Sequence, residues 1–357
     1  MNRWEVGSEF EWSNRFLKST VDSTWLPDTY ELYSTGTASI LAVYHLFVQQ
    51  QKRPARIHLP SFYCMSVAAK LRKFLQVFWY QDIPTQPAPN FKSLQTQPGD
   101  LVVAFNIFGI RSNQPWLEWS AAHPEVTLIE DHSHDPFSDW AKQSKADYAI
   151  SSLRKTLPIP DGGILWSPQN LPLFTAWGQE SLGAYKRLTA MLLKRAYLKN
   201  NNVAKDAYRQ LELESHGEMG FIEDTVVSSF TAKILPCLDV VNMRSRRAEN
   251  INKFIHLSLN NPSDDWELLF DSWGPGNVPL NSVIVCHTGE IRNALRKYLI
   301  EHNIYTAVHW KQPDEGISSE DPLTLDLAQR ILTIPNDHRY DTEDIVRMFN
   351  TISAFTI

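Results

Sequence analysis

Short apolar runs alternate with amphipathic runs along the first two-thirds of the chain, and this alternation constrains the fold more than any other feature. The apolar runs have the length of buried strands and cover residues 56–60, 75–82, 100–109, 126–135, 146–153 and 162–167. Two amphipathic segments between them, 36–51 and 66–75, have the pattern of helices. Strands and helices in turn form a sheet that is covered by helices. The sequence therefore predicts an α/β layered domain with a largely parallel sheet.

The chain after residue 168 has a different pattern. Residues 169–214 are mainly helical in pattern, and residues 224–255 have the pattern of a long, interrupted helical connector. After Asn261, short apolar runs and two amphipathic helices indicate a compact α+β unit. We therefore expect a large domain over residues 1–244 and a small C-terminal domain over residues 245–357.

Composition argues against several classes of protein. A net charge of −6 over 357 residues argues against a general nucleic-acid binder, whose domain is normally basic. No apolar run approaches the roughly 18 residues of a membrane span, and the first twelve residues lack the apolar core of a signal peptide. Three widely spaced cysteines, Cys64, Cys237 and Cys286, suit free buried thiols better than disulfides or a structural zinc site. We expect a cytoplasmic protein that binds neither nucleic acid nor a membrane.

The segment STGTAS, residues 34–39, opens the first predicted helix. Ser34 or Thr35 can cap that helix, and Gly36 permits a close approach to a ligand. The free N–H groups of a helix start, together with the helix dipole, attract an anion. Many ordinary helices begin with similar residues, so an anion site is one interpretation and a plain helix cap is the other.

The segment IEDHSHD, residues 129–135, follows a predicted strand and is open to three interpretations. It can be a polar loop with acidic caps. It can also be a metal site, because His132 and His134 with flanking carboxylates supply two or three ligands. In the third interpretation a carboxylate holds a protonated heterocyclic nitrogen, and Asp131 is then the natural candidate.

The segment SSLRKTLPIPDGG, residues 151–163, places Lys155 between the end of a buried strand and a stiff Pro-Asp-Gly-Gly turn. Most lysines are solvated surface charges, but this position is typical of a reactive group. A lysine amine forms Schiff bases, and desolvation or a neighbouring cation such as Arg154 activates it by lowering its pKa. A Schiff-base lysine, a carboxylate for a ring nitrogen and an anion site are the parts that a pyridoxal phosphate enzyme needs. A zinc site would leave Lys155 unexplained.

The order of these motifs resembles that of the DegT/StrS-type sugar aminotransferases, a branch of the fold type I pyridoxal phosphate-dependent enzymes. The motifs that carry the resemblance are STGTASILAVYHLF, IEDHSHDPF and SLRKTLPIPDGGIL. The resemblance covers roughly residues 30–165 and 280–350. It implies a three-layer large domain with a mostly parallel sheet and a small α+β C-terminal domain.

The resemblance also implies roles for three residues at the reacting end of the site. Lys155 is expected to form the Schiff base with pyridoxal 5′-phosphate and to carry the proton during transamination. Asp131 is expected to pair with the pyridinium nitrogen and keep it protonated. His134 stands where the family has glutamine or histidine near the phenolic oxygen of the cofactor.

Four further residues are expected to hold the phosphate of the cofactor. By the same resemblance, Gly36 and Thr37 donate backbone N–H groups to it. Either Ser152 or Ser151 adds a hydroxyl group.

The chain also departs from the family pattern. Cys64 stands near the position of the aromatic residue that stacks on the cofactor ring, so Tyr63 or Phe62 is expected to take over that role. Asn106 stands where histidine is common. The Asn-x-Arg-Met segment through which a neighbouring subunit often completes the site is not recognisable, and GFIEDT, residues 220–225, occupies that region.

The resemblance implies an aminotransferase that moves an amino group from glutamate or a similar donor to a keto acceptor. In this family the acceptor is a nucleotide-linked keto sugar. One alternative is a pyridoxal phosphate enzyme of the same fold that acts on an amino acid or another biosynthetic intermediate. The other is a non-catalytic binding or regulatory protein of this fold. Because fold type I sites lie at a dimer interface, a homodimer is expected.

Three features are candidates for substrate binding, namely Asn106, His309 and one basic segment. His309 lies where the small domain of the family faces the mouth of the active site, although a surface or core histidine is also possible. The segment RSRR, residues 244–247, can bind nucleotide phosphates, but its pattern favours a solvated helix face.

Overall fold

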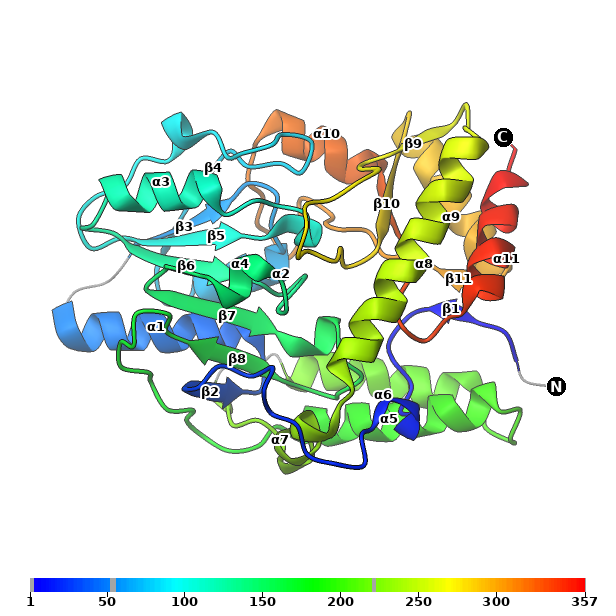
Figure 1. The fold of residues 1–357 in the computed structure, drawn as a ribbon, viewed down its shortest axis with the longest axis horizontal. Helices are drawn as coiled ribbons and strands as arrows, with labels where there is room; N and C mark the ends of the chain where they lie inside the picture. The colour runs from blue at the N-terminus through cyan, green and yellow to red at the C-terminus, as the bar shows by residue number, and fades with distance from the viewer. Residues whose placement is uncertain (1–2, 52–55, 220–222, 357) are drawn as a thin grey trace.

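The computed structural model describes residues 3–51, 56–219 and 223–356, and a seven-stranded sheet forms the centre of its larger part (Figure 1). The strand order is β2-β8-β7-β6-β5-β3-β4. These strands are β2 (Tyr30–Tyr33), β3 (Arg56–Pro60), β4 (Gln76–Tyr80), β5 (Leu101–Phe105), β6 (Thr127–Asp131), β7 (Tyr148–Ser152) and β8 (Gly163–Trp166). Strand β8 is antiparallel to both of its neighbours, β2 and β7, and the other pairs of neighbouring strands are parallel. The mostly parallel sheet predicted from the sequence is confirmed.

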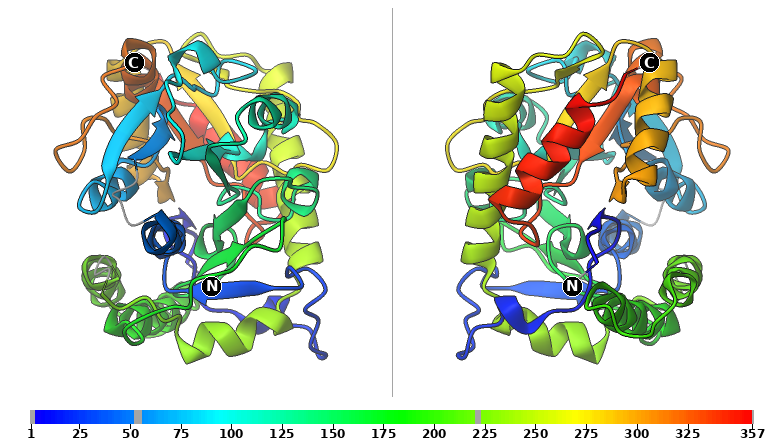
Figure 2. Two further views of the ribbon diagram at one scale, coloured as in Figure 1. Left: turned by 90° about the vertical axis from the view of Figure 1, so that its left-hand side faces the viewer. Right: turned by 90° about the vertical axis from the view of Figure 1, so that its right-hand side faces the viewer.

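Helices cover both faces of the sheet, which gives three layers. Helices α1 (Gly36–Gln51) and α2 (Met65–Leu71) lie on one face, whereas α3 (Gln114–Ala122) and α4 (Asp139–Lys142) lie on the other (Figure 2). The first predicted helix is confirmed to the residue. The second predicted helix ends four residues earlier than expected, because Arg72 closes it as its C-cap.

Glycine is needed where the first turn of α1 approaches the sheet. A Cβ atom on Gly36 would lie 3.0 Å from the Cβ of Ser152, at the end of β7. A Cβ atom on Gly163, at the start of β8, would lie 2.2 Å from the carbonyl oxygen of Thr35. Real Cβ contacts do not occur at that distance, so only glycine lets the helix start pack against the carboxyl end of β7.

Helices α5 (Leu182–Leu198) and α6 (Lys205–Glu218) form a hairpin, consistent with the helical pattern of residues 169–214. Lys194 anchors this hairpin to the N-terminal segment of the chain. Its Nζ lies 3.6 Å from the carboxylate of Glu5 and donates hydrogen bonds to Ser8 Oγ and Glu9 O, both at 2.6 Å. The side chain of Lys194 is almost fully buried, so these partners replace the water that it loses.

The C-terminal part contains a three-stranded antiparallel sheet with the order β12-β10-β9 and its own buried core. The strands are β9 (Trp266–Leu268), β10 (Ser282–Cys286) and β12 (Ile331–Ile334), and the helices are α9 (Gly289–Glu301), α10 (Pro322–Arg330) and α11 (Thr342–Ser353). An α+β unit was predicted here, although α10 was not. The carboxyl ends of the parallel strands of the large sheet face this part (Figure 1).

The connector between the two parts consists of α7 (Ser229–Ile234) and α8 (Val240–Asn260). The predicted boundary between residues 244 and 245 therefore falls inside α8, which runs from the sheet to the C-terminal part (Figure 1). The N-terminal strand β1 (Val6–Gly7) pairs with β11 (Ile304–Tyr305) of the C-terminal part. The start of the chain therefore packs with the small unit, which its sequence position did not predict.

Two smaller expectations concern cysteines and membranes. All three cysteines are free, but only Cys286 is buried, while Cys64 and Cys237 are partly exposed. No helix among the described residues is long and apolar enough to cross a membrane.

Candidate active site

A cavity lies at the carboxyl ends of the parallel strands, beside the first turn of α1; we call it the lysine cavity. Of the residues predicted from the sequence, its lining contains Gly36, Thr37, Tyr63, Asp131, Ser152 and Lys155. These residues come from four separate segments of the chain. The three predicted clusters therefore meet at one place, as expected for the carboxyl edge of a parallel sheet.

Lys155 is partly buried on a short turn that directly follows β7. Burial lowers the pKa of its amine, and the Arg154 charge lowers the pKa further. The charge of Asp131 acts in the opposite direction and raises the pKa of Lys155. The amine lies 5.6 Å from the ring centre of Trp310, which covers it. Lys155 is therefore an activated amine in a cavity and not a solvated surface charge.

His134 fixes the protonation state around this amine. Its Nδ1 accepts a hydrogen bond of 2.8 Å from the N–H of Phe108, so the ring proton belongs on Nε2. Nε2 lies 3.4 Å from Nζ of Lys155. Burial lowers the pKa of His134 well below its ordinary value, and the Lys155 charge adds to this effect. The neutral imidazole can therefore donate its Nε2 proton toward an uncharged amine.

Asp131 ends β6 and is held by two hydrogen bonds. Its Oδ1 accepts from the N–H of Ser133 at 2.9 Å, and its Oδ2 accepts from the hydroxyl of Tyr63 at 2.6 Å. Burial raises the pKa of Tyr63 well above its ordinary value, and the Asp131 charge raises it further. Tyr63 therefore stays a donor, and the carboxylate keeps lone pairs for one more N–H donor in the cavity.

The opposite end of the cavity is rich in unpaired donors. Within the described residues, neither the backbone N–H groups of Gly36 and Thr37 nor the hydroxyls of Thr37 and Ser152 have a hydrogen-bond partner. Thr37 and Ser152 are only 7% and 9% exposed. Ser151 instead directs its hydroxyl to His132 O at 3.4 Å, outside this lining. Of the two predicted serines, Ser152 is the one that faces the cavity.

The aromatic residues around the cavity differ from the expectation. Tyr63 and Cys64 both line it, whereas Phe62 does not. The ring of Phe62 packs against Trp310, with 5.4 Å between ring centres. Trp310 also stacks on His134 at 5.5 Å and 15°. Its role was missed because the sequence placed its segment near the mouth of the site but did not indicate which side chain of the segment covers Lys155.

A second cavity of about 510 Å³ opens beside the first and shares Arg154, Lys155 and His216 with it; we call it the arginine cavity. His309 lines this cavity, with its Nδ1 at 2.8 Å from Thr333 Oγ1. Burial lowers the pKa of His309 to about 3, and Lys155 contributes, so the ring is neutral. Asn106 lines neither cavity, because its Oδ1 accepts from the N–H of Arg111 at 3.1 Å.

Basic side chains dominate the arginine cavity. They are Arg154, Lys155, Arg187, Arg209, Arg247, Arg296 and Arg339, against the acidic Glu9, Glu212 and Asp337. Of the segment interpreted as a solvated helix face, residues 244–247, Ser245 is exposed, but Arg244 and Arg247 do not face solvent freely. Arg247 is 3% exposed because α8 packs it against the cavity, and Arg244 makes a two-pronged pair with Asp135.

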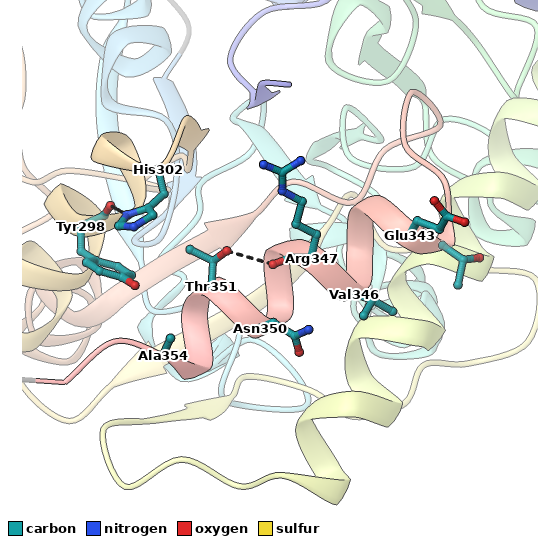
Figure 3. Close-up of a pocket in the computed structure, with 9 residues that line it drawn as sticks. Tyr298, His302, Glu343, Val346, Arg347, Asn350, Thr351 and Ala354 are labelled. Atoms are coloured by element: carbon teal, nitrogen blue, oxygen red, sulfur yellow. Dashed lines mark hydrogen bonds between the residues drawn. The ribbon is translucent and has the colours of Figure 1, made fainter. Parts of the chain in front are cut away.

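Two other features lie outside this site. In the described part of the chain, no three His, Cys, Asp or Glu side chains gather where they could hold a metal. His132 faces Glu130 instead, with Nε2 and Oε2 3.1 Å apart. A surface hollow of about 580 Å³ lies between α9 and α11 and shares no residue with the two cavities; Tyr298 and His302 border it (Figure 3).

The segment GFIEDT was expected to take the place of a contact from a neighbouring subunit. Residues 220–222 of this segment lie outside the described residues. Of the remainder, Thr225 accepts a backbone hydrogen bond of 2.8 Å from the N–H of Ser34. This bond ties the segment to the loop that precedes α1.

No protein-family model matches the chain, and no curated protein matches it by sequence. Solved structures do match it. The PLP form of Spr1654 from Streptococcus pneumoniae, assigned as a sugar aminotransferase, has a TM-score of 0.64 at 12% identity, over 99% of this chain and 98% of that one. PseC from Helicobacter pylori, an aminotransferase of pseudoaminic acid biosynthesis, has a TM-score of 0.63 at 11% identity, over 98% of both chains.

A third structure, that of DesI with its TDP-sugar product, has a TM-score of 0.62 at 15% identity. It covers 91% of this chain and 79% of that one. At identities this low the similarity concerns the fold. The chain has the fold of the sugar aminotransferases, which is the fold type I architecture expected from its motifs.

Proposed function

We propose that this protein is a pyridoxal 5′-phosphate-dependent aminotransferase. The observation that carries the proposal is the lysine cavity, in which Lys155, Asp131 and the unpaired donors at the start of α1 surround one space. The fold adds support, since similar structures include PLP and PMP forms of an aminotransferase.

The residues of the lysine cavity fit this cofactor at each of its three polar positions. Lys155 offers an amine whose pKa is lowered by burial, which suits a Schiff base. Asp131 offers a carboxylate with free lone pairs for the ring nitrogen. The hydroxyls and N–H groups at the start of α1 offer donors for the phosphate.

The cofactor, when bound, supplies an aldehyde for the donor's amino group and a ring that accepts electrons. The Lys155 amine takes the α-proton of the donor and later gives a proton back, which completes the amino transfer. Asp131 holds a positive charge on the ring nitrogen, and Tyr63 keeps Asp131 in place. His134 orients the Lys155 amine from one side, and Trp310 excludes water from it on the other.

The acceptor that we propose is an anionic keto compound, with a nucleotide-linked keto sugar as the leading candidate. The arginine cavity supports this choice because its basic residues outnumber its acidic ones, and it opens directly onto Lys155. DesI, a protein of the same fold, is solved with a TDP-sugar product. A keto acceptor derived from an amino acid is the alternative, and its smaller charge would match fewer of these basic residues.

An absorbance spectrum of the purified protein tests the proposal. We expect a visible absorbance band with added pyridoxal 5′-phosphate, and its loss on adding an amino donor such as L-glutamate. Borohydride reduction should attach the cofactor to the peptide that contains Lys155. A protein without any such band at millimolar cofactor would contradict the proposal. A band that no amino donor changes would support the non-catalytic alternative.

We also propose that the protein is a cytoplasmic homodimer. Several large apolar side chains on the α5–α6 hairpin are exposed, namely Leu182, Tyr185, Leu192 and Leu213. Exposed apolar groups on neighbouring helices are typical of subunit interfaces. Light scattering at micromolar concentration tests this, and a monomer with bound cofactor would contradict it.

A further inference from the structure

Three nitrogen-bearing side chains converge on the lysine cavity from separate elements of the chain. Lys70 comes from α2, Arg154 from the turn after β7 and His216 from α6. Arg154 belongs to the motif around Lys155, whereas Lys70 and His216 lie outside the three motifs that predicted the site. Their only common feature is that all three line the lysine cavity.

None of the three side chains has a partner in the part of the chain that the structure describes. Neither a hydrogen bond nor an ion pair joins Lys70, Arg154 or His216 to another described residue. The Nε atom of Arg154 is buried without an acceptor. Other arginines of the arginine cavity are paired, such as Arg187 with Glu9 and Arg339 with Asp337.

The charge of Arg154 disfavours a positive charge on Lys70 and His216, whereas Glu315 favours the charge of Lys70, and Glu9 favours that of Arg154 and of His216. Burial lowers the pKa of Lys70 and of His216, and in both cases the charge of Arg154 lowers it further. Burial is likewise the main cause that lowers the pKa of Arg154. Lys70 and Arg154 are half-buried and His216 is exposed. Partly desolvated cations without an acidic partner are stabilised when an anion lies between them.

A second set of donors marks the position of that anion. The hydroxyls of Thr37 and Ser152, both at least nine-tenths buried, face the same cavity without a partner among the described residues. Ser152 ends β7, and Lys155 lies on the short turn that follows it. A ligand whose anionic group reaches Ser152 can therefore place its other end against the Lys155 amine.

We propose that Lys70, Arg154 and His216 bind the phosphate of the cofactor together with Ser152 and the first turn of α1. This inference rests on the proposed function. A phosphate has several acceptor oxygens, which suits donors that arrive from three directions. All of these groups belong to one chain, and the α5–α6 hairpin supplies His216. The phosphate site is therefore complete within a single chain, even if two chains form the dimer.

Comparison of pyridoxal 5′-phosphate with pyridoxal tests the proposal. Pyridoxal lacks the phosphate but keeps the aldehyde. The dissociation constant of pyridoxal divided by that of pyridoxal 5′-phosphate therefore measures how much the phosphate contributes to binding. We expect Arg154→Gln to reduce that ratio by roughly tenfold to a hundredfold, as for a lost hydrogen bond between charged groups. Lys70→Met and His216→Gln should each reduce it by roughly threefold to tenfold. Absorbance titration of the purified variants measures both constants.

Two matched variants serve as controls. Lys73→Met removes an exposed lysine from the same segment as Lys70, and Arg209→Gln removes an arginine that lines only the arginine cavity. Neither should change the ratio. Inorganic phosphate should compete with pyridoxal 5′-phosphate in the wild type, and it should compete more weakly in Arg154→Gln.

The outcomes separate this inference from the proposed function. A wild-type protein that binds neither compound at Lys155 contradicts the proposed function itself. A wild type that binds both, with variants that keep the wild-type ratio, contradicts the phosphate site and leaves the aminotransferase proposal standing. Unchanged circular dichroism of each variant shows that the fold is retained.

A mixing experiment tests whether one chain is sufficient. His216→Gln and Lys155→Ala chains are combined, allowed to exchange subunits, and titrated with pyridoxal 5′-phosphate. If His216 served the site of the partner, mixed dimers would regain sites with wild-type affinity. We expect no such recovery, and its appearance would overturn completion within one chain.

Discussion

The two sides of the lysine cavity are built in different ways. On the strand side, Asp131 ends β6 and Lys155 follows the neighbouring parallel strand β7. The pairing register of β6 and β7 therefore sets the distance between the two residues. On the hairpin side, His216 is brought to the cavity by α6, which packs on α5 and not on the sheet. The strand side is set by local chain geometry, whereas the hairpin side depends on tertiary contacts.

The contacts of the two sides differ accordingly. Asp131 is held by short hydrogen bonds to Tyr63 and Ser133 next to it in space. The hairpin is held by ion pairs and hydrogen bonds to the N-terminal segment. Lys194 and Lys205 of the hairpin both contact Glu5 of that segment. We therefore expect changes on the strand side to affect chemistry, and changes at the base of the hairpin to affect stability and binding.

The largest effect should come from the strand side. Lys155→Ala removes both the Schiff-base amine and the proton carrier. We expect amino transfer to fall by at least about 10⁴-fold, the upper end of what acid–base catalysis contributes. Single-turnover conversion of the bound cofactor by L-glutamate, followed by absorbance, measures this loss. Thermal unfolding close to that of the wild type would show that the fold is intact, and near-normal conversion would refute the assignment.

Asp131→Asn should have the next largest effect. The amide keeps the shape of the side chain but loses the charge that stabilises a protonated ring nitrogen. We expect the rate to fall on the order of 10²–10³-fold, as for other well-placed electrostatic contacts. Tyr63→Phe is the graded control, because it removes only one hydrogen bond to Asp131 and should cost much less. Equal losses in the two variants would contradict the role given to the charge.

The third prediction concerns the base of the hairpin. Lys194→Met keeps the length of the side chain but removes the hydrogen bonds to Ser8 and Glu9 and the contact with Glu5. We expect it to lower the free energy of unfolding by about 3 kcal/mol. Urea denaturation measures this change.

A control for the third prediction lies on the same helix. Leu192→Ala alters a side chain that is 49% exposed, so it should change the free energy of unfolding by no more than about 0.5 kcal/mol. If Lys194→Met were as mild as this control, the N-terminal segment would not hold the hairpin.

The same contrast explains how much could be predicted from sequence. Strand ends next to polar motifs gave the positions of Asp131 and Lys155, because parallel strands bring their carboxyl ends to one edge. Ser152 was left as an alternative to Ser151, since a shift of one residue turns a side chain to the other face of a strand. Only the structure shows which of the two serines faces the cavity.

The residues that reach the two cavities from distant segments had no such signal in the sequence. Trp310 and His216 reach the cavity through packing between segments that are distant in the chain. Arg247 lies on a helix whose charged pattern resembles that of a solvated face, and only the packing of α8 buries it. Periodicity identifies a helix and its faces, but it does not specify which distant element covers each face.

The smallest effect tests how neighbouring charges set the pKa of Lys155 on the strand side. The Lys155 amine attacks an aldehyde only when it is uncharged, so the rate of Schiff-base formation rises with pH and levels off above the pKa of Lys155. Because burial lowers that pKa, the inflection should lie below that of an ordinary lysine. The charge of Arg154 lowers the same pKa, so Arg154→Gln should move the inflection to higher pH. The charge of Asp131 raises it, so Asp131→Asn should move the inflection to lower pH. Stopped-flow absorbance with pyridoxal, which has no phosphate to bind, measures both shifts, and shifts of the same sign would contradict the opposing influence of the two charges.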